Sequence, residues 1–218
     1  MFWLFNKNLD LAERIQLVTA YILQLILVVA IVWAWLEQEW FVSFLTCGIL
    51  VLTLLPAIIQ RSSKVYLPVE FHFVPIAYIF AALFMGDMHG YYTYFWWWDV
   101  VLHTMSGALL GIAGFVLIYV LNTEKKIFNR LRPGFMALFS FAFAVAIGAI
   151  WEIFEFTMDT NFGFNLQRTG LHDTMWDLIV DVAGALFIAI IGFFYVRSKN
   201  YSTLFSRFVH RFVDKNPK

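Results

Sequence analysis

The sequence has few charged residues and a single cysteine among its 218 positions. Charged side chains make up 14% of the chain and apolar ones 61%, whereas soluble domains have about 25% and about 45–50%. This imbalance excludes a water-soluble fold. The formal net charge is zero, so the composition does not indicate nucleic-acid binding. Cys47 has no second cysteine to pair with, and we interpret it as a packing residue.

The sequence contains six long apolar stretches. They cover about residues 16–36, 41–59, 69–85, 98–121, 135–158 and 174–196. A membrane-spanning helix needs about 20 apolar residues. We therefore predict an all-α bundle of six transmembrane helices that forms one integral membrane domain over residues 1–218. The first stretch has no small-residue cleavage site of the secretory kind after it, so we expect it to be retained.

The basic residues predict how the chain is oriented. Fourteen of the fifteen Lys and Arg residues fall at the termini and in alternate loops, and Arg168 is the exception. Because basic residues in short loops stay in the cytoplasm, we predict the inner (cytoplasmic) membrane as the location, with both termini cytoplasmic. Aromatic residues crowd the predicted outer boundary from Tyr91 to Trp98. After the last span, Phe205, Phe208 and Phe212 predict an amphipathic helix along the inner leaflet.

Ionisable residues inside the spans need an explanation, because each costs at least ~2.5 kcal/mol on insertion scales. They lie near the predicted outer ends of the last three spans: Asp99 and His103; Glu152, Glu155 and Asp159; Asp173, Asp177 and Asp181. Spacings of three and four put each group on one helix face. Since the chain alternates in direction, all three groups reach the same height in the membrane. We therefore expect them to converge.

Small residues continue the same three faces toward the cytoplasm. They are Gly107, Gly111 and Gly114; Ala144 and Gly148; Ala185, Ala189 and Gly192. Small side chains let helix backbones approach closely. We predict close packing in the inner half and a polar cavity, lined by the acids, where the helices splay outward. The Gly107 and Gly111 stripe also fits packing between two copies of the chain, so an oligomer stays open.

Helix capping is the structural alternative for some of the acids. Asp99 and Asp173 fall where helices are expected to begin, and Thr174 with Asp177 has the spacing of a capping box. Asp181 lies one turn deeper, beyond the reach of a cap. Glu152 and Glu155 lie at the C-terminal end of their helix, where the dipole disfavours negative charge.

Bound cations would balance this charge, because only His103, His172 and Arg168 are candidate partners on this side. Buried carboxylates must otherwise be protonated or hydrated. We expect a divalent metal, which could be zinc, manganese, iron or magnesium, with Asp99, His103, Asp177 and Asp181 as ligands. Glu152 or Glu155 would act as general base. The remaining polar residues assigned to the site are Asp159, Gln167, Arg168 and Asp173.

Three segments carry a family resemblance: WWWDVVLHTMSGALLG, GAIWEIFEFTMD and LHDTMWDLIVDVAGA. Over about residues 67–192 the chain resembles the YjdF-type family of bacterial inner-membrane proteins, although Asp87 stands where that pattern has glutamate. The resemblance implies no established activity. The last three spans are more distantly similar to VanZ-like proteins, which are associated with resistance to a glycopeptide antibiotic that acts on cell-wall precursors. That similarity implies matching positions at Asp99, His103, Glu152, Gln167, Asp177 and Asp181.

Three functions fit these residues. The first is metal-assisted action on a lipid or a lipid-linked envelope precursor at the outer face. The second is proton- or cation-coupled transport, for which Glu70 and His72 near the inner end of the third span are further candidates. The third is a non-catalytic role as a lipid-binding or scaffold protein in the bilayer. The sequence does not choose between them, and it does not show whether the protein is an enzyme.

Overall fold

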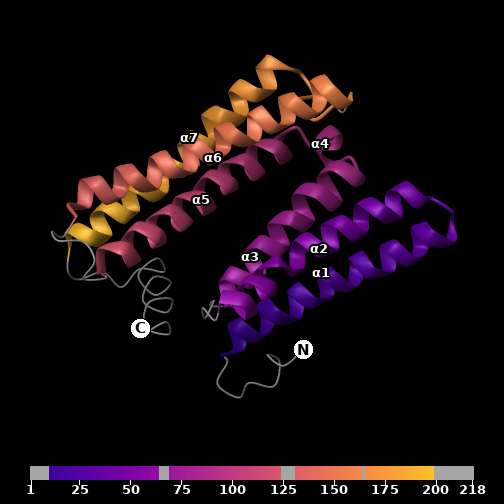
Figure 1. Cartoon of the computed structure of the whole chain (residues 1–218), viewed down its shortest axis with the longest axis horizontal. Coiled ribbons are helices and arrows are strands. Elements are labelled where there is room, and N and C mark those ends of the chain that lie inside the picture. Colours follow the sequence, from indigo (N-terminus) through magenta and orange to yellow (C-terminus); the bar gives the residue numbers. More distant parts are fainter. Residues whose placement is uncertain (1–9, 64–68, 124–130, 164, 199–218) are drawn as a thin grey trace. The chain divides into compact units, whose positions relative to one another are not determined.

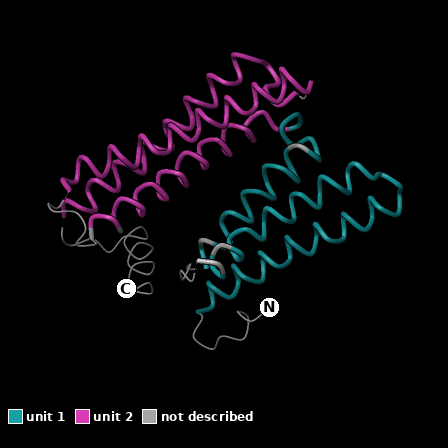
Figure 2. Tube along the Cα trace, in the orientation of Figure 1, with its two compact units in different colours: residues 1–94, 210–218 teal, residues 95–209 magenta. Residues whose placement is uncertain are grey.

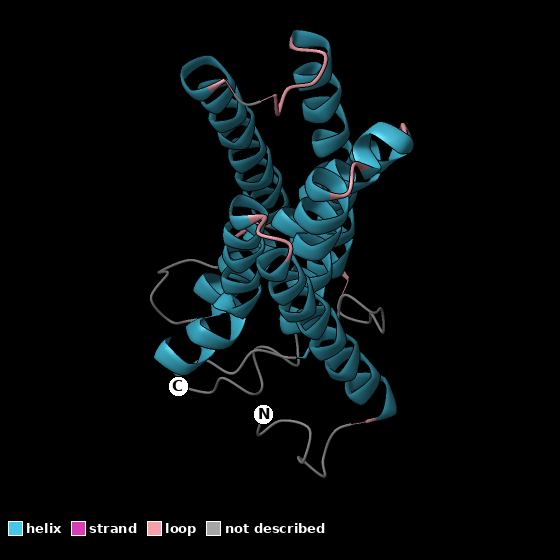
Figure 3. Cartoon of the chain, turned by 90° about the vertical axis from the view of Figure 1, so that its right-hand side faces the viewer, coloured by secondary structure: helices cyan, strands magenta, loops and turns pink. Residues whose placement is uncertain are grey.

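The computed structural model of the protein describes residues 10–63, 69–123, 131–163 and 165–198. Within these ranges every regular element is a helix (Figure 3). Five of the described helices are long and apolar enough to cross a membrane. They are α1 (Leu11–Leu36), α2 (Trp40–Ser63), α5 (Trp97–Thr123), α6 (Pro133–Phe162) and α7 (Leu171–Arg197). The prediction of an all-helical membrane fold is confirmed, and each helix extends a few residues beyond the apolar stretch that predicted it.

The third predicted span is an interrupted helix. It consists of α3 (Val69–Ile79) and a π-helix, η1 (Phe80–Met88), and the short helix α4 (Tyr91–Tyr94) follows it. Pro75 lies inside α3 and has no N–H to donate, so the regular ladder is already broken one turn before the π-helix begins. The apolar part covers only His72–Gly86. The sixth membrane crossing therefore stays a prediction.

The chain divides into two compact units, shown in teal and magenta in Figure 2. Unit 1 comprises Met1–Tyr94 and His210–Lys218, and unit 2 comprises Phe95–Val209. Helices α1 to α4 and η1 belong to unit 1, whereas α5, α6 and α7 belong to unit 2. A single membrane domain stays a prediction. The amphipathic helix expected after residue 198 lies outside the described residues.

Unit 1 packs around an apolar core that includes Leu27, Phe80 and Phe84. Polar side chains add hydrogen bonds between its helices. The side-chain amide of Gln24 on α1 donates to the Thr53 hydroxyl on α2 at 3.3 Å. Near the other end of α2, the Thr46 hydroxyl lies 3.5 Å from the sulfur of Met88. Such bonds hold helices together where lipid gives no hydrophobic drive for association.

In unit 2, α5, α6 and α7 run side by side (Figure 1). Gly107 on α5 packs against the backbone carbonyl of Asp181 on α7, and Gly184 on α7 packs against the carbonyl of Thr104. The Ser140 hydroxyl on α6 donates to the Gly111 carbonyl at 2.7 Å. The predicted packing through small residues is confirmed. It continues outward to the level of Asp181, where the sequence analysis expected the helices to splay apart.

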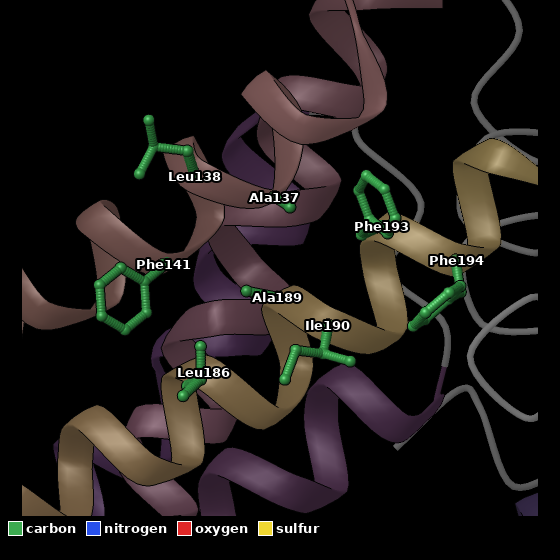
Figure 4. Close-up of a pocket in the computed structure, with 8 residues that line it drawn as sticks. All are labelled: Ala137, Leu138, Phe141, Leu186, Ala189, Ile190, Phe193 and Phe194. Atoms are coloured by element: carbon green, nitrogen blue, oxygen red, sulfur yellow. The ribbon is translucent and has the colours of Figure 1, made fainter.

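An apolar groove of about 250 Å³ lies along α6 and α7 (Figure 4). It is lined by Ala137, Leu138, Phe141, Leu186, Ala189, Ile190, Phe193 and Phe194. On both helices these positions are on the opposite side of the helix midpoint from the acidic residues. The groove is therefore separate from the acidic cluster.

The contact between α5 and α7 predicts that Gly184→Ala destabilises unit 2. A methyl group at position 184 would overlap the Thr104 carbonyl and lie 3.0 Å from the backbone nitrogen of Ala108, neither of which can move without shifting a helix. Overpacking of this kind lowers the free energy of unfolding by about 1–3 kcal/mol. The measurement is the thermal unfolding midpoint in detergent. Gly134→Ala is the control, because nothing lies within 4 Å of its added methyl; equal midpoints for both variants would contradict the packing.

Candidate functional site

Helices α5 and α7 bring three aspartates together around His103. Its Nε2 atom lies 3.6 Å from Oδ1 of Asp99 and 3.8 Å from Oδ1 of Asp177. Its Nδ1 atom lies 3.5 Å from Oδ2 of Asp181. Asp99 and His103 are four residues apart on α5, and Asp177 and Asp181 are four apart on α7. Each pair therefore lies on one face of its helix, one turn apart, and the two faces are turned toward each other. The four residues that the sequence analysis assigned as metal ligands are thus neighbours in space, and their role as ligands stays a prediction.

The two ring nitrogens of His103 face different partners. Nδ1 faces Asp181, whereas Nε2 faces Asp99 and Asp177. A neutral imidazole with its proton on Nδ1 would have its Nε2 lone pair available to a cation. The Ser106 hydroxyl donates to the other oxygen of Asp181 at 2.5 Å. Asp99, His103 and Asp177 each offer one ligand atom, and these three atoms lie within 4.8 Å of one another. Asp181 holds the imidazole from the other side.

The acids on α7 are buried because α5 and α7 pack closely beside them. Asp177 is 4% exposed and Asp181 is 3% exposed. Gly148 on α6 makes room for the Asp181 side chain, since a methyl group at that position would come within 2.8 Å of Oδ2. The Asp181 carboxylate therefore lies where all three helices of unit 2 meet.

Glu152 on α6 is buried beside this cluster without a well-formed hydrogen bond. It is 4% exposed, and neither carboxylate oxygen has a hydrogen-bond partner among the described residues. His103 and Asp181 are among its ionisable neighbours, and the Thr174 hydroxyl lies near it outside normal hydrogen-bond geometry. An uncompensated buried polar group costs roughly 2–7 kcal/mol. Glu152 must therefore be protonated, hydrated or matched by a bound group.

Glu155, the other predicted catalytic acid, is in a different situation. It lies one turn from Glu152 and is half-buried. Its Oε1 atom accepts a hydrogen bond from the indole nitrogen of Trp151 at 2.9 Å. One of its oxygens therefore has a partner within α6 itself.

Asp159 and Asp173 shape the loop between α6 and α7. The two oxygens of Asp159 accept the backbone N–H groups of Leu166 and Gln167, both at 2.8 Å. Asp173 accepts the N–H of Arg168 at 3.0 Å. The Gln167 side chain donates to the Thr174 hydroxyl at 2.6 Å. The sequence analysis placed these residues near the site, but it missed that they fasten the loop, since no local motif links position 159 to position 166.

The fastened loop brings a cation to the edge of the cluster. The Arg168 guanidinium lies 3.6 Å from Oδ2 of Asp99, and its side chain is 28% exposed. Asp99 is therefore shared between His103 and Arg168. The sequence analysis gave Arg168 as one of three candidate cations for the acids, without assigning it to Asp99.

Helix capping does not explain Asp177. Helix α7 begins at Leu171 after the N-cap residue Gly170, which makes no side-chain cap. Asp177 lies in the second turn, and the Thr174 hydroxyl accepts from Gln167. The capping-box interpretation of Thr174 and Asp177 is wrong because the N-cap residue is Gly170, four residues before Thr174.

The comparisons with known proteins agree with the membrane fold. A family model described as "Predicted membrane protein (DUF2238)" matches residues 19–198. The chain belongs to this family. An uncharacterized protein of Thermotoga maritima is 34% identical over 114 residues, which cover 52% of this chain and 56% of the relative. The chain thus spans about half the length of that relative. No solved structure matches the chain.

The family description gives a membrane location and no activity. It is compatible with the YjdF-type resemblance, whereas the similarity to VanZ-like proteins gains no support from these matches.

The loop geometry predicts that Asp159→Ala loosens the segment after α6. The substitution removes two hydrogen bonds to a carboxylate, each worth about 1.5–3 kcal/mol. Amide hydrogen exchange at Leu166 and Gln167 should therefore accelerate by roughly tenfold or more. Asn161→Ala is the control, because the Asn161 side chain donates only to the Thr157 carbonyl in its own helix. Unchanged exchange in the Asp159 variant would show that other contacts hold the loop.

Proposed function

We propose that the protein is a multi-pass membrane metalloprotein whose unit 2 binds one divalent cation through Asp99, His103 and Asp177. The observation that carries the proposal is the convergence of one ligand atom from each residue within 4.8 Å. Two carboxylates and an imidazole suit zinc, manganese or iron. The two negative charges balance the cation, which lowers the cost of burying them.

The distances match the size of a metal site. Two ligands at about 2.0–2.2 Å from a tetrahedral metal lie roughly 3.4 Å apart. The Nε2 atom of His103 is 3.6 Å from Asp99 and 3.8 Å from Asp177. Both distances from Nε2 exceed that value by only a few tenths of an ångström, and all three ligand atoms lie within 4.8 Å of one another.

Asp181 has a positioning role in this proposal rather than the role of a fourth ligand. Metal-binding histidines almost always donate their second N–H to a carboxylate, carbonyl or water, which fixes the ring and raises its basicity. Asp181 occupies that place at Nδ1, and Ser106 fixes Asp181 in turn. The ligand set predicted from the sequence is thereby reduced from four residues to three.

The metal centre faces the outer side of the inner membrane in this proposal, with both termini in the cytoplasm and with α3 and η1 as the sixth crossing. The asymmetry of the basic residues supports this orientation. The exposed indoles of Trp96 and Trp97 lie at the start of α5, beside Asp99. Tryptophan is enriched at headgroup depth, which supports a site that is open to lipid headgroups.

The site acts on a lipid or a lipid-linked envelope precursor. A bound divalent cation would polarise a phosphate or ester oxygen. Glu152 is suited to accept the proton of the attacking water and return it to the leaving oxygen, with one water consumed as the ester bond breaks. Its oxygens are free of well-formed hydrogen bonds, whereas Glu155 is bonded to Trp151. Glu152 is therefore the stronger candidate for the general base.

The metal content of the purified protein tests the proposal. We expect about one divalent ion per wild-type chain by elemental mass spectrometry after dialysis in detergent. Asp177→Asn and His103→Ala should each lose it, because each removes one of three ligands. Asp181→Asn should keep the site but weaken its affinity about 10–100-fold, as expected for a residue that orients a ligand.

Glu39→Gln serves as the control, since Glu39 is exposed in unit 1. Wild-type protein without bound metal, after exposure to each candidate ion, would refute the metal centre. Loss of metal from Asp181→Asn as complete as from Asp177→Asn would instead make Asp181 a ligand.

A further inference from the structure

Several hydrogen bonds hold Arg168 and the residue before it at the edge of the acidic cluster. Its backbone N–H is bound by Asp173, and the preceding residue, Gln167, is bound by Asp159 and contacts Thr174. Partly exposed ion pairs contribute only about 0–1 kcal/mol to stability. The contact between Arg168 and Asp99 at 3.6 Å therefore adds little to stability, so the guanidinium can also contact a ligand at small cost.

A cation bound at Asp99 would change the surroundings of Arg168. Asp99 points one oxygen at His103 and the other at Arg168. A divalent ion bound to Asp99 would neutralise part of the carboxylate's negative charge, so the attraction between Asp99 and the guanidinium would fall. The ion and the guanidinium would then be two positive groups on either side of one carboxylate. An anion that contacts both groups would remove this repulsion. A guanidinium presents a planar fork that fits phosphate with two parallel hydrogen bonds.

The location of this edge also favours an anion. Asp99 lies in the first turn of α5 and Asp173 in the first turn of α7. The N-terminal ends of both helices therefore point here, and their dipoles favour negative charge. Trp96, which is 84% exposed, adjoins the same end of α5. Tryptophan is enriched at the depth of the lipid headgroups, where the lipid phosphates lie.

We propose that the ligand of the site carries a phosphate group, which binds between the divalent cation and the guanidinium of Arg168. This inference rests on the proposed metal centre and names the chemistry that the centre recognises. The partly exposed side chain of Arg168 gives access to the site from the loop side. The phosphate belongs to a lipid headgroup or is free phosphate, and these two sources can be separated by experiment.

The test measures ligand binding by calorimetry on metal-loaded protein in detergent. The probes are a short-chain phosphatidic acid, a neutral diacylglycerol with the same chains, and inorganic phosphate. We expect the phosphatidic acid to bind wild-type protein and the diacylglycerol not to bind. Arg168→Gln should weaken binding about tenfold or more, because it removes a charged hydrogen-bond donor. Arg168→Lys should retain part of the affinity, since the charge stays and the fork is lost.

The metal content of each variant is measured first, so that failure of the metal centre is distinct from failure of this inference. Arg132→Gln is the matched control, because Arg132 is exposed at the opposite end of α6. Full metal loading with weakened phosphate binding in Arg168→Gln alone supports the inference. Inorganic phosphate that competes equally well identifies a free phosphate, and binding of the phosphatidic acid alone identifies a headgroup.

Equal affinities of metal-loaded wild type and Arg168→Gln overturn the inference, as does binding of neither phosphate probe. Wild-type protein without metal overturns the metal centre and the bridging phosphate together.

Discussion

The close approach of α5 and α7 is the constraint on which unit 2 depends. Gly107 and Gly184 let each helix lie against a backbone carbonyl of the other. At that distance, side chains on the facing surfaces are removed from water, so Asp177 and Asp181 are almost completely buried. Burying carboxylates costs several kcal/mol each unless charge and hydrogen bonds compensate. The same contact that gives the unit its packing therefore creates its demand for positive charge.

The protein meets this demand with few groups. His103 contacts three aspartates, Ser106 donates to Asp181, and Arg168 reaches Asp99 from the loop. These contacts are unevenly distributed, since each oxygen of Asp181 has one neighbour, whereas Nε2 of His103 lies between two carboxylate oxygens. Each polar feature thus has a different consequence: Asp181 orients the imidazole, whereas the side facing Asp99 and Asp177 has the composition and spacing of a cation site.

Much of this arrangement could be predicted from the sequence, because it follows from the length of the apolar runs and from the alternating direction of the chain. Long apolar runs gave five helices to within a few residues, and alternating chain direction brought His103 and Asp181 to one level. The π-helix in the third span was not predicted, since its apolar sequence is also compatible with a regular helix. Gly184 was missed because its neighbour Ala185 also fits the small-residue stripe. The loop contacts of Asp159 could not be predicted, since they depend on a turn whose geometry no motif encodes.

X-ray absorption spectroscopy of the metal-loaded protein tests the central claim most directly, because it reports the atoms around the ion. The account predicts one imidazole nitrogen and at least two oxygen neighbours at about 2.0–2.2 Å for zinc. His103 lies within 4 Å of Asp99 and Asp177, so the imidazole signal should disappear in His103→Ala. A spectrum with oxygen neighbours alone would contradict the account, since the ion would then lie away from His103.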